Sequence, residues 1–205
     1  MEGPRFLHLE SVGSTQDVAR TLPIGSVVMA DYQTHGRGRL SHRWDSPPGS
    51  ALLVSFVLQP NPLLSLAAGI AAAEACGRGV RLKWPNDLLL DSRKVGGILV
   101  EASPSRAVCG IGINLSWAPE DAAKLDEPRA ELLERLRAAM ERWASAPAAE
   151  VVARWRELSD TIGQKVRVEL PDRIVEGTVQ DIDEAGNLVV DGTPISAGSV
   201  TVLGG

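Results

Sequence analysis

The segment over residues 36–44 combines arginines, glycines and a tryptophan in one short stretch, and it reads GRGRLSHRW. Glycine lets backbone N–H groups approach an anion closely, and the planar guanidinium of arginine binds phosphate in a bidentate manner. Trp44 could stack on a base or cover an apolar ligand. The segment therefore predicts a phosphate-binding loop, with a basic surface loop or a nucleic-acid contact as alternatives. It is not a P-loop, because no Gly-Lys-Ser/Thr follows.

Three shorter clusters follow this loop, and each also has a purely structural interpretation. KWPND at residues 83–87 puts Asn86 and Asp87 on a turn after a strand, which by itself is typical of a decorated β-turn. KVGG at residues 94–97 suits a carboxylate or phosphate ligand, or else a lysine on an edge strand. GIGIN at residues 110–114 has glycines where side chains would block a pocket, or where a strand would bulge. No Ser-His-Asp spacing and no Cys/His metal-ligand pattern accompanies these clusters.

The composition of the 205-residue chain excludes several classes of protein. The chain is 44% hydrophobic, which excludes wholesale disorder, and its net charge of −5 argues against a DNA-coating protein. Its two cysteines, Cys76 and Cys109, lie in apolar surroundings and are expected to be buried thiols. We expect no secretory signal and no membrane-spanning segment, because the longest apolar run, over residues 62–76, is too short and contains Ser65 and Glu74. These features predict a soluble, cytoplasmic protein.

The hydrophobic pattern predicts the elements that position the clusters. Strands are expected over residues 1–11, 26–31, 51–58, 80–84, 88–90, 94–101 and 107–115, with a hairpin connection at residues 91–93. The capping-box spacing from Ser14 to Asp17 predicts a helix that ends near Leu22. Asn61-Pro62 predicts a second helix that ends at Cys76. The segment over residues 119–158 is expected to be helical, with a break near Pro147.

The pattern changes character at Gly163. Short strands at close spacing are expected over residues 166–168, 174–179, 187–190, 193–195 and 200–203. This is typical of an SH3-like β-barrel, which at this size should pack against the main domain. We therefore expect an α+β protein with a mixed-sheet catalytic domain over residues 1–160 and a small C-terminal barrel over residues 163–205.

Taken together, the four motifs resemble those of the biotin–protein ligases. The residues that carry the resemblance are GRGR with Trp44, KWPNDL from Lys83, KVGGILVE from Lys94 and GIN from Gly112, preceded by Ser14-Thr15-Gln16. The resemblance covers the whole chain, including the barrel, and implies a catalytic domain of the biotin/lipoate ligase type. It implies that biotin and ATP, with Mg²⁺, give biotinyl-5′-AMP. The biotinyl group would then pass to a lysine of a biotin carboxyl carrier protein, a subunit of acetyl-CoA carboxylase.

Two other functions remain as alternatives. A lipoate or octanoate ligase or transferase would share the catalytic fold. A non-catalytic RNA-binding module, with the loop as a phosphate clamp, is an alternative of another class.

The resemblance also implies which residues form the site. Biotin would be bound by Ser14, Thr15, Gln33, Gly36, Arg37, Lys94, Gly97 and Gly112. ATP would be bound by Arg37, Arg39, His42, Trp44, Asn86, Lys94 and Asn114. The cations Arg37, Arg39 and Lys94 would screen the carboxylate from the α-phosphate during adenylation. Asp87 would orient the incoming lysine or help to position the metal, and no metal ligands are assigned.

The chain departs from the family's pattern at two points. The family's loop usually reads Gly-Arg-Gly-Arg-x-Gly-Arg-x-Trp, whereas Ser41 and His42 here replace the second Gly-Arg pair. Histidine carries less positive charge than arginine near neutral pH, and Arg43 could compensate. Some relatives carry an N-terminal DNA-binding domain, which we do not expect here because the motifs begin close to Met1. We therefore expect no DNA binding, and we expect a homodimer because relatives commonly form one.

Overall fold

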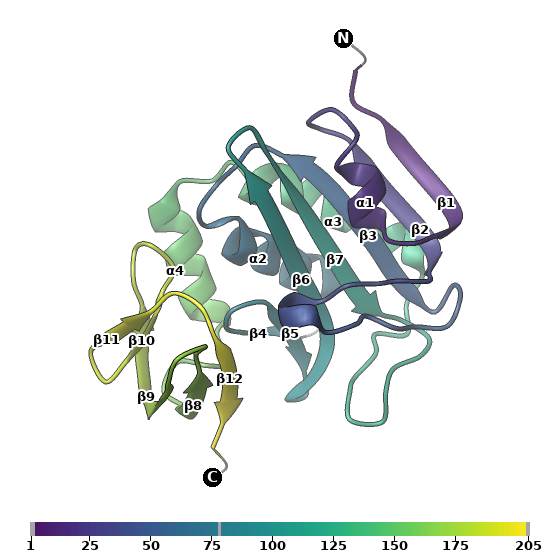
Figure 1. Cartoon of the computed structure of the whole chain (residues 1–205). Helices are drawn as coiled ribbons and strands as arrows, with labels where there is room; N and C mark the ends of the chain where they lie inside the picture. Colours follow the sequence, from purple (N-terminus) through teal and green to yellow (C-terminus); the bar gives the residue numbers. More distant parts are fainter. Residues whose placement is uncertain (1–2, 78, 204–205) are drawn as a thin grey trace.

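A seven-stranded mixed sheet forms the body of the protein in the computed structural model, which describes residues 3–77 and 79–203 (Figure 1). The strands lie in the order β1 (Phe6–Val12), β2 (Val27–Gln33), β3 (Ala51–Leu58), β7 (Arg106–Asn114), β6 (Arg93–Ser103), β5 (Asp87–Leu90) and β4 (Arg81–Lys83). Within this sheet β1 pairs with β2 in parallel, and the other neighbouring strands pair antiparallel. The predicted mixed sheet and α+β class are therefore confirmed.

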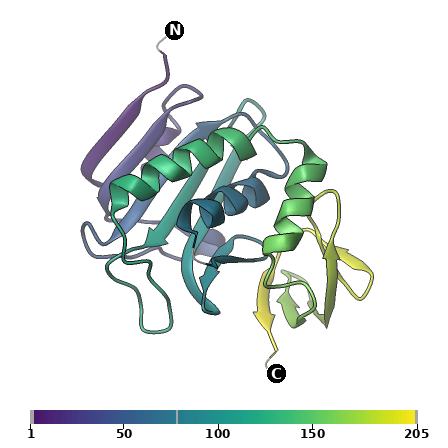
Figure 2. The same ribbon diagram turned by 180° about the vertical axis from the view of Figure 1, so that it is seen from behind.

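The two faces of this sheet are covered by different elements. Helices α2 (Leu64–Cys76) and α3 (Arg129–Trp143) lie over one face, as Figure 2 shows from behind. The short helix α1 (Thr15–Ala19) and the segment over residues 33–50, with its single 3-10 turn η1 (Arg39–Ser41), lie over the other face (Figure 1). Because side chains alternate between the faces of a strand, Val27 packs in the core under α2 and Val28 in the smaller core under α1.

Helix α2 is buried nearly all round, which explains its long apolar run. Its buried residues are all those of the helix except Ser65 and Glu74. Glu74 accepts hydrogen bonds from Nε1 of Trp143 on α3 at 2.8 Å and from Nε of Arg154 at 2.9 Å, the latter on α4 (Ala148–Leu158). Ser65 Oγ donates to the carbonyl oxygen of Pro85. The two polar residues of α2 thus have partners, as buried polar groups require.

Most predicted elements are confirmed, with corrections at three helices. Helix α2 has Leu63 at its N-cap, so the predicted cap at Asn61 is wrong, although Asn61 Oδ1 accepts a hydrogen bond from the Leu63 amide at 2.9 Å. Helix α1 ends at Ala19 rather than near Leu22, because the amides of Thr21 and Leu22 donate to carbonyls three residues back and the chain continues in tighter turns. The predicted helical start at residue 119 is wrong, since α3 begins only at Arg129. The preceding segment pairs with strands instead: the Ala123 amide donates to the carbonyl of Lys94 at 2.9 Å.

The C-terminal residues form a second, five-stranded antiparallel sheet. Its order is β11 (Thr193–Ile195), β10 (Leu188–Val190), β9 (Ile174–Ile182), β8 (Lys165–Glu169) and β12 (Ser199–Val202), which confirms the predicted small barrel. It packs against the main domain, as expected. Trp84 Nε1 donates to the Gly186 carbonyl at 3.1 Å, and Arg156 binds the Asp181 carboxylate through two nitrogens at 2.6 and 2.8 Å. One apolar cluster runs from α2 through to the barrel.

Both cysteines are buried free thiols, as predicted. Burial raises the pKa of the Cys76 and Cys109 thiols to about 12, so neither forms a reactive thiolate near neutral pH. Across the described residues, the helices are too short or too polar to span a bilayer.

Candidate active site

A pocket of about 250 Å³ opens on the sheet face that carries α1 and the glycine-arginine loop. Its floor is the middle of β6 and β7, where Gly97 pairs with Gly112 and Leu99 with Gly110. A Cβ atom on Gly112 would lie 2.7 Å from the ring of Trp44, and one on Gly110 would lie 3.0 Å from Oε1 of Gln16. The pairing of β7 runs through these glycines without a register shift. They therefore make room for side chains lying on the sheet, and the bulge alternative is wrong.

One end of the pocket is closed by a buried polar network. Gln33 Oε1 accepts hydrogen bonds from the amide and the hydroxyl of Thr15, at 2.7 and 3.1 Å. The Thr15 hydroxyl also lies 2.8 Å from Ser55 Oγ, which donates to Gln16 Oε1 at 3.1 Å. Gln16 Nε2 in turn donates to Glu101 Oε2 at 2.8 Å. These bonds hold hydroxyl and amide groups in set positions at the inner end of the pocket.

Ser14 stands beside this network with a free hydroxyl. It occupies the N-cap position of α1, with φ −154° and ψ 139°, so the predicted helix start is correct. Its side chain nevertheless makes no capping bond, and Ser14 Oγ is buried without a partner. A buried hydroxyl without a hydrogen bond is costly, so this group is available to a polar ligand.

The glycine-arginine loop folds back on itself above the floor. The Trp44 amide donates to the Gly36 carbonyl at 3.1 Å, and the Gly38 amide donates to the His42 carbonyl at 2.7 Å. A Cβ atom on Gly36 would overlap the carbonyl oxygen of Trp44, so only glycine permits this closure. The Trp44 ring consequently lies over Gly112, with its Nε1 buried and without a partner.

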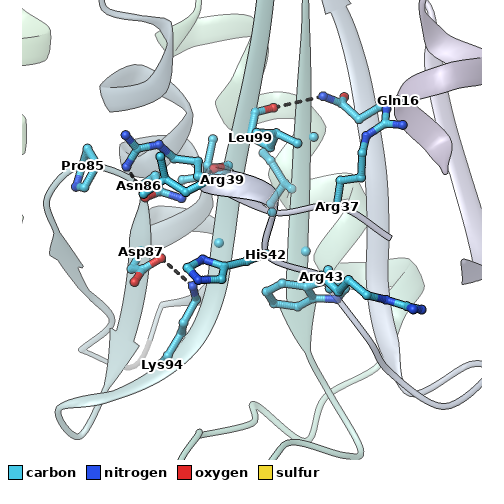
Figure 3. Close-up of a pocket in the computed structure, with 18 of the residues that line it drawn as sticks. Gln16, Arg37, Arg39, His42, Arg43, Pro85, Asn86, Asp87, Lys94 and Leu99 are labelled. Carbon is cyan, nitrogen blue, oxygen red and sulfur yellow. Dashed lines mark hydrogen bonds and ion pairs between the residues drawn. The ribbon is translucent and has the colours of Figure 1, made fainter. Parts of the chain in front are cut away.

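Cationic side chains gather at the other end of the pocket (Figure 3). Lys94 Nζ lies 2.6 Å from Asp87 Oδ1, and Arg39 Nη1 donates to Asn86 Oδ1 at 3.2 Å. Burial lowers the pKa of Arg39, with the Asp87 charge opposing this shift, and the guanidinium remains protonated at neutral pH. Partly desolvated cations of this kind attract anions more strongly than exposed ones. This end suits phosphate or carboxylate groups.

Arg37 is directed differently from Arg39. In Figure 3 its side chain extends toward Gln16 and away from Lys94. Its two terminal nitrogens bind the carboxylate of Asp17 at 3.0 and 2.8 Å, while its Nε is buried without a partner.

The C-terminal barrel supplies part of the wall. Gly198, Ser199 and Val200 line the pocket, and the Gly198 carbonyl accepts a bond of 3.5 Å from Arg39 Nη1. Nothing in the sequence indicated this contact, because the residues lie far apart along the chain and are joined only by the docking of the barrel.

Most of the residues predicted for the site do meet in this one pocket. Those that line it are Ser14, Thr15, Gln33, Arg37, Arg39, His42, Trp44, Asn86, Asp87, Lys94, Gly97 and Gly112. Gly36 and Asn114 lie outside the lining. Asn114 Nδ2 instead donates to the Ala123 carbonyl at 3.0 Å and so holds the segment that follows β7. Direct ligand contacts from these two residues stay predictions.

Sequence reasoning did not assign Gln16, Ser55, Leu99 or Gly110 to the site. The signal was present for some of them, since Gly110 belongs to the GIGIN motif and faces the same side of β7 as Gly112. For a metal, no group of three or more His, Cys, Asp or Glu side chains that could hold an ion occurs in residues 3–77 and 79–203.

Comparison with known proteins gives consistent matches over the chain. Residues 10–117 match the biotin/lipoate A/B protein ligase family, and residues 161–202 match the biotin protein ligase C terminal domain. A biotin--[acetyl-CoA-carboxylase] ligase of Mycobacterium tuberculosis is 35% identical over 87% of this chain and 79% of its own length. The bifunctional ligase/repressor BirA of Escherichia coli is 33% identical over 83% of this chain, which spans 63% of that relative.

Solved structures agree with the sequence matches. A biotin protein ligase from Aquifex aeolicus, in complex with biotin and ATP, superimposes with a TM-score of 0.81 at 27% identity. The match covers 97% of this chain and 98% of that one.

The close fit of Trp44 on Gly112 leads to a prediction about stability. Gly112→Ala should lower the free energy of unfolding by about 1–3 kcal/mol, because the added methyl overpacks against the indole ring. In a Trp44→Ala background the same change should be nearly neutral, and urea denaturation of the four proteins measures this coupling. Gly13→Ala is the matched control, since a Cβ there meets no atom within 4 Å. Equal losses with and without Trp44 would contradict the assignment of the ring to this place.

Proposed function

This chain belongs to the biotin/lipoate A/B protein ligase family, and we propose that it is a biotin–protein ligase. In the first step a carboxylate oxygen of biotin attacks the α-phosphorus of ATP. The bond to the leaving pyrophosphate breaks, and biotinyl-5′-AMP forms. In the second step the ε-amine of a carrier lysine attacks the acyl carbon, AMP leaves and an amide bond forms.

The observation that carries this proposal is the polar, closed end of the pocket. Biotin ends in a ureido ring that both donates and accepts hydrogen bonds, and Ser14 Oγ is a buried hydroxyl that lacks a partner. Thr15 and Gln33 lie at the same end of the pocket. The dithiolane of lipoate and the chain end of octanoate would leave the Ser14 hydroxyl unsatisfied. A site built to hydrogen-bond its substrate discriminates strongly against analogues that lack the polar group.

The cationic end supports the adenylation step. A carboxylate that attacks a phosphate brings two anions together, so positive charge must lie between or beside them. Lys94 and Arg39 line the pocket here and are the proposed cations. The Lys94 ammonium lies over the floor at Gly97, where a Cβ atom would be at ordinary contact distance, 3.5 Å, from Nζ. In this arrangement Mg²⁺ would enter the site bound to the phosphates of ATP.

The remaining site residues fit the nucleotide and the second step. Trp44 offers a flat ring for the base, and His42 and Asn86 line the same region. Asp87 holds Lys94 at 2.6 Å and, as the carboxylate at the cationic end, would orient the carrier lysine. The carrier would be a biotin carboxyl carrier protein, as the names of the relatives suggest.

We further propose a cytoplasmic homodimer that does not bind DNA. The net charge of −5 supports the absence of DNA binding. So does the direction of the loop arginines, because Arg37 and Arg39 are engaged by Asp17 and Asn86 beside the pocket. An RNA-phosphate clamp would need such cations on an open surface.

Incubation with biotin, ATP, Mg²⁺ and a biotin carboxyl carrier domain tests the proposed function. Intact-mass analysis should show one biotinyl group on one lysine of the carrier. Biotin, lipoate and octanoate should be compared in the same ATP–pyrophosphate exchange assay. We expect exchange with biotin, and exchange with lipoate or octanoate alone would contradict the proposal.

Lys94→Ala should reduce biotin-dependent pyrophosphate exchange by about 100-fold or more, the usual effect of removing one group that stabilises developing charge. The melting temperature should be unchanged, because the Lys94 side chain is 45% exposed. Lys165→Ala, at an exposed position on β8, is the control and should retain exchange. Unchanged exchange in Lys94→Ala would refute the role given to this lysine.

His42→Arg restores the residue usual in the family. The loop closure uses the backbone carbonyl of His42, so the side chain can change without opening the loop. We expect the affinity for ATP to rise or to stay the same, measured as KM in the exchange assay. A large loss of adenylation rate would instead show that His42 has a role of its own.

A further inference from the structure

Beside the inner end of the pocket, two acids and two arginines form a closed ring of ion pairs. Asp17 binds both terminal nitrogens of Arg37, and it also accepts a hydrogen bond from Arg20 at 3.1 Å. Arg20 in turn binds Glu101 at 2.5 Å, and Glu101 lies 3.7 Å from Arg37. Three separate parts of the chain contribute these residues, namely α1 with its C-cap residue Arg20, the glycine-arginine loop and β6.

The ring is connected to the polar network of the pocket. Glu101 accepts a second hydrogen bond, from Gln16 Nε2 at 2.8 Å. Gln16 is buried and lies over Gly110 on the pocket floor. The ring is therefore an outer layer of the site, although Asp17, Arg20 and Glu101 do not themselves line the pocket.

The consequence for Arg37 is a fixed orientation. A carboxylate that binds both Nη atoms sets the plane of the guanidinium, and such bidentate pairs are the most directional of ion pairs. One N–H of each Nη is engaged by Asp17, and Nε is the Arg37 donor that is buried without a partner. Arg37 lines the pocket and extends toward Gln16, at the end opposite Lys94 and Asp87 (Figure 3).

We propose that Asp17, supported by Glu101, is a positioning residue that orients Arg37 to contact biotin and not ATP. This inference rests on the proposed function, and it gives the two arginines of the loop different roles. Arg37 presents its free Nε–H to the biotin half of the pocket. Arg39 and Lys94 remain at the other end for the phosphates.

The electrostatics of the ring agree with this role. Hydrogen bonds from Arg37 keep the pKa of Asp17 below its usual value, so the carboxylate is ionised throughout the neutral range. The same bonds raise the pKa of Arg37. Asp17 is 49% and Arg37 35% exposed, and ion pairs this exposed contribute little to stability. The ring is thus better suited to orient a side chain than to hold the fold together.

Asp17→Asn tests the inference, because it keeps the size of the side chain and removes its charge. Biotin binding, measured by calorimetry without ATP or carrier, should weaken by about 10-fold, as expected when a charge-assisted, bidentate pair is replaced by a neutral bond. The KM for ATP at saturating biotin and the melting temperature should be unchanged. Asp172→Asn, which removes an exposed acid paired with Arg173 in the barrel, is the control and should bind biotin normally.

A double-mutant cycle separates positioning from a general structural role. In an Arg37→Met background, Asp17→Asn should have no further effect on biotin affinity, because Asp17 acts only through Arg37. Glu101→Gln should weaken biotin binding in the same direction as Asp17→Asn. The inference is wrong if Asp17→Asn binds biotin like the wild type, or if the KM values for biotin and ATP rise together as the melting temperature falls. If the wild-type protein itself fails to bind biotin, the proposed function fails first.

Discussion

The site depends on a strip of the central sheet that carries no side chains. Gly97 and Gly112 are paired across β6 and β7, and Gly110 follows on the same face. Cβ atoms at Gly112 and Gly110 would lie 2.7 Å from the Trp44 ring and 3.0 Å from Gln16 Oε1. Larger residues at these two positions would crowd the Trp44 ring and the Gln16 amide, which line the pocket. The rest of the site therefore depends on glycine residues in β6 and β7 that let side chains approach the backbone of the sheet closely.

The core on the opposite face of the sheet holds the glycine-containing part of β6 and β7 in place. There α2 is buried nearly all round between the sheet and helices α3 and α4, and the same apolar cluster continues into the barrel. Trp84 and Arg156 join the barrel to the main domain. One continuous core thus supports both parts, and it holds Gly198 of the barrel beside Arg39 of the loop.

Much of the fold could be predicted because local patterns decided it. Alternating or continuous apolar runs located the strands, and the turn at residues 91–92 takes the positive φ angles of a two-residue hairpin. The segment before α3 could not be predicted from its composition. Its backbone bonds to Lys94 and Asn114, far away in sequence, outweigh its helical propensity. The capping spacing at Ser14 likewise predicted the helix start correctly, but it did not predict that the Ser14 hydroxyl makes no capping bond.

By itself the sequence determined the residue types of the site, their order and the family, because glycines, arginines and a lysine at those spacings carry the chemistry locally. Only the tertiary structure decided which partner each of these side chains has and toward which end of the pocket it extends. It placed Arg37 on Asp17 and Arg39 beside Asn86, although the two arginines are separated by a single glycine. It also placed residues of the barrel in the wall of the pocket, and it placed Asn114 outside the lining, where its side chain donates to the Ala123 carbonyl. The physical reason is that a side chain's direction is set by partners distant in sequence, whose positions depend on how the sheet, the helices and the barrel pack.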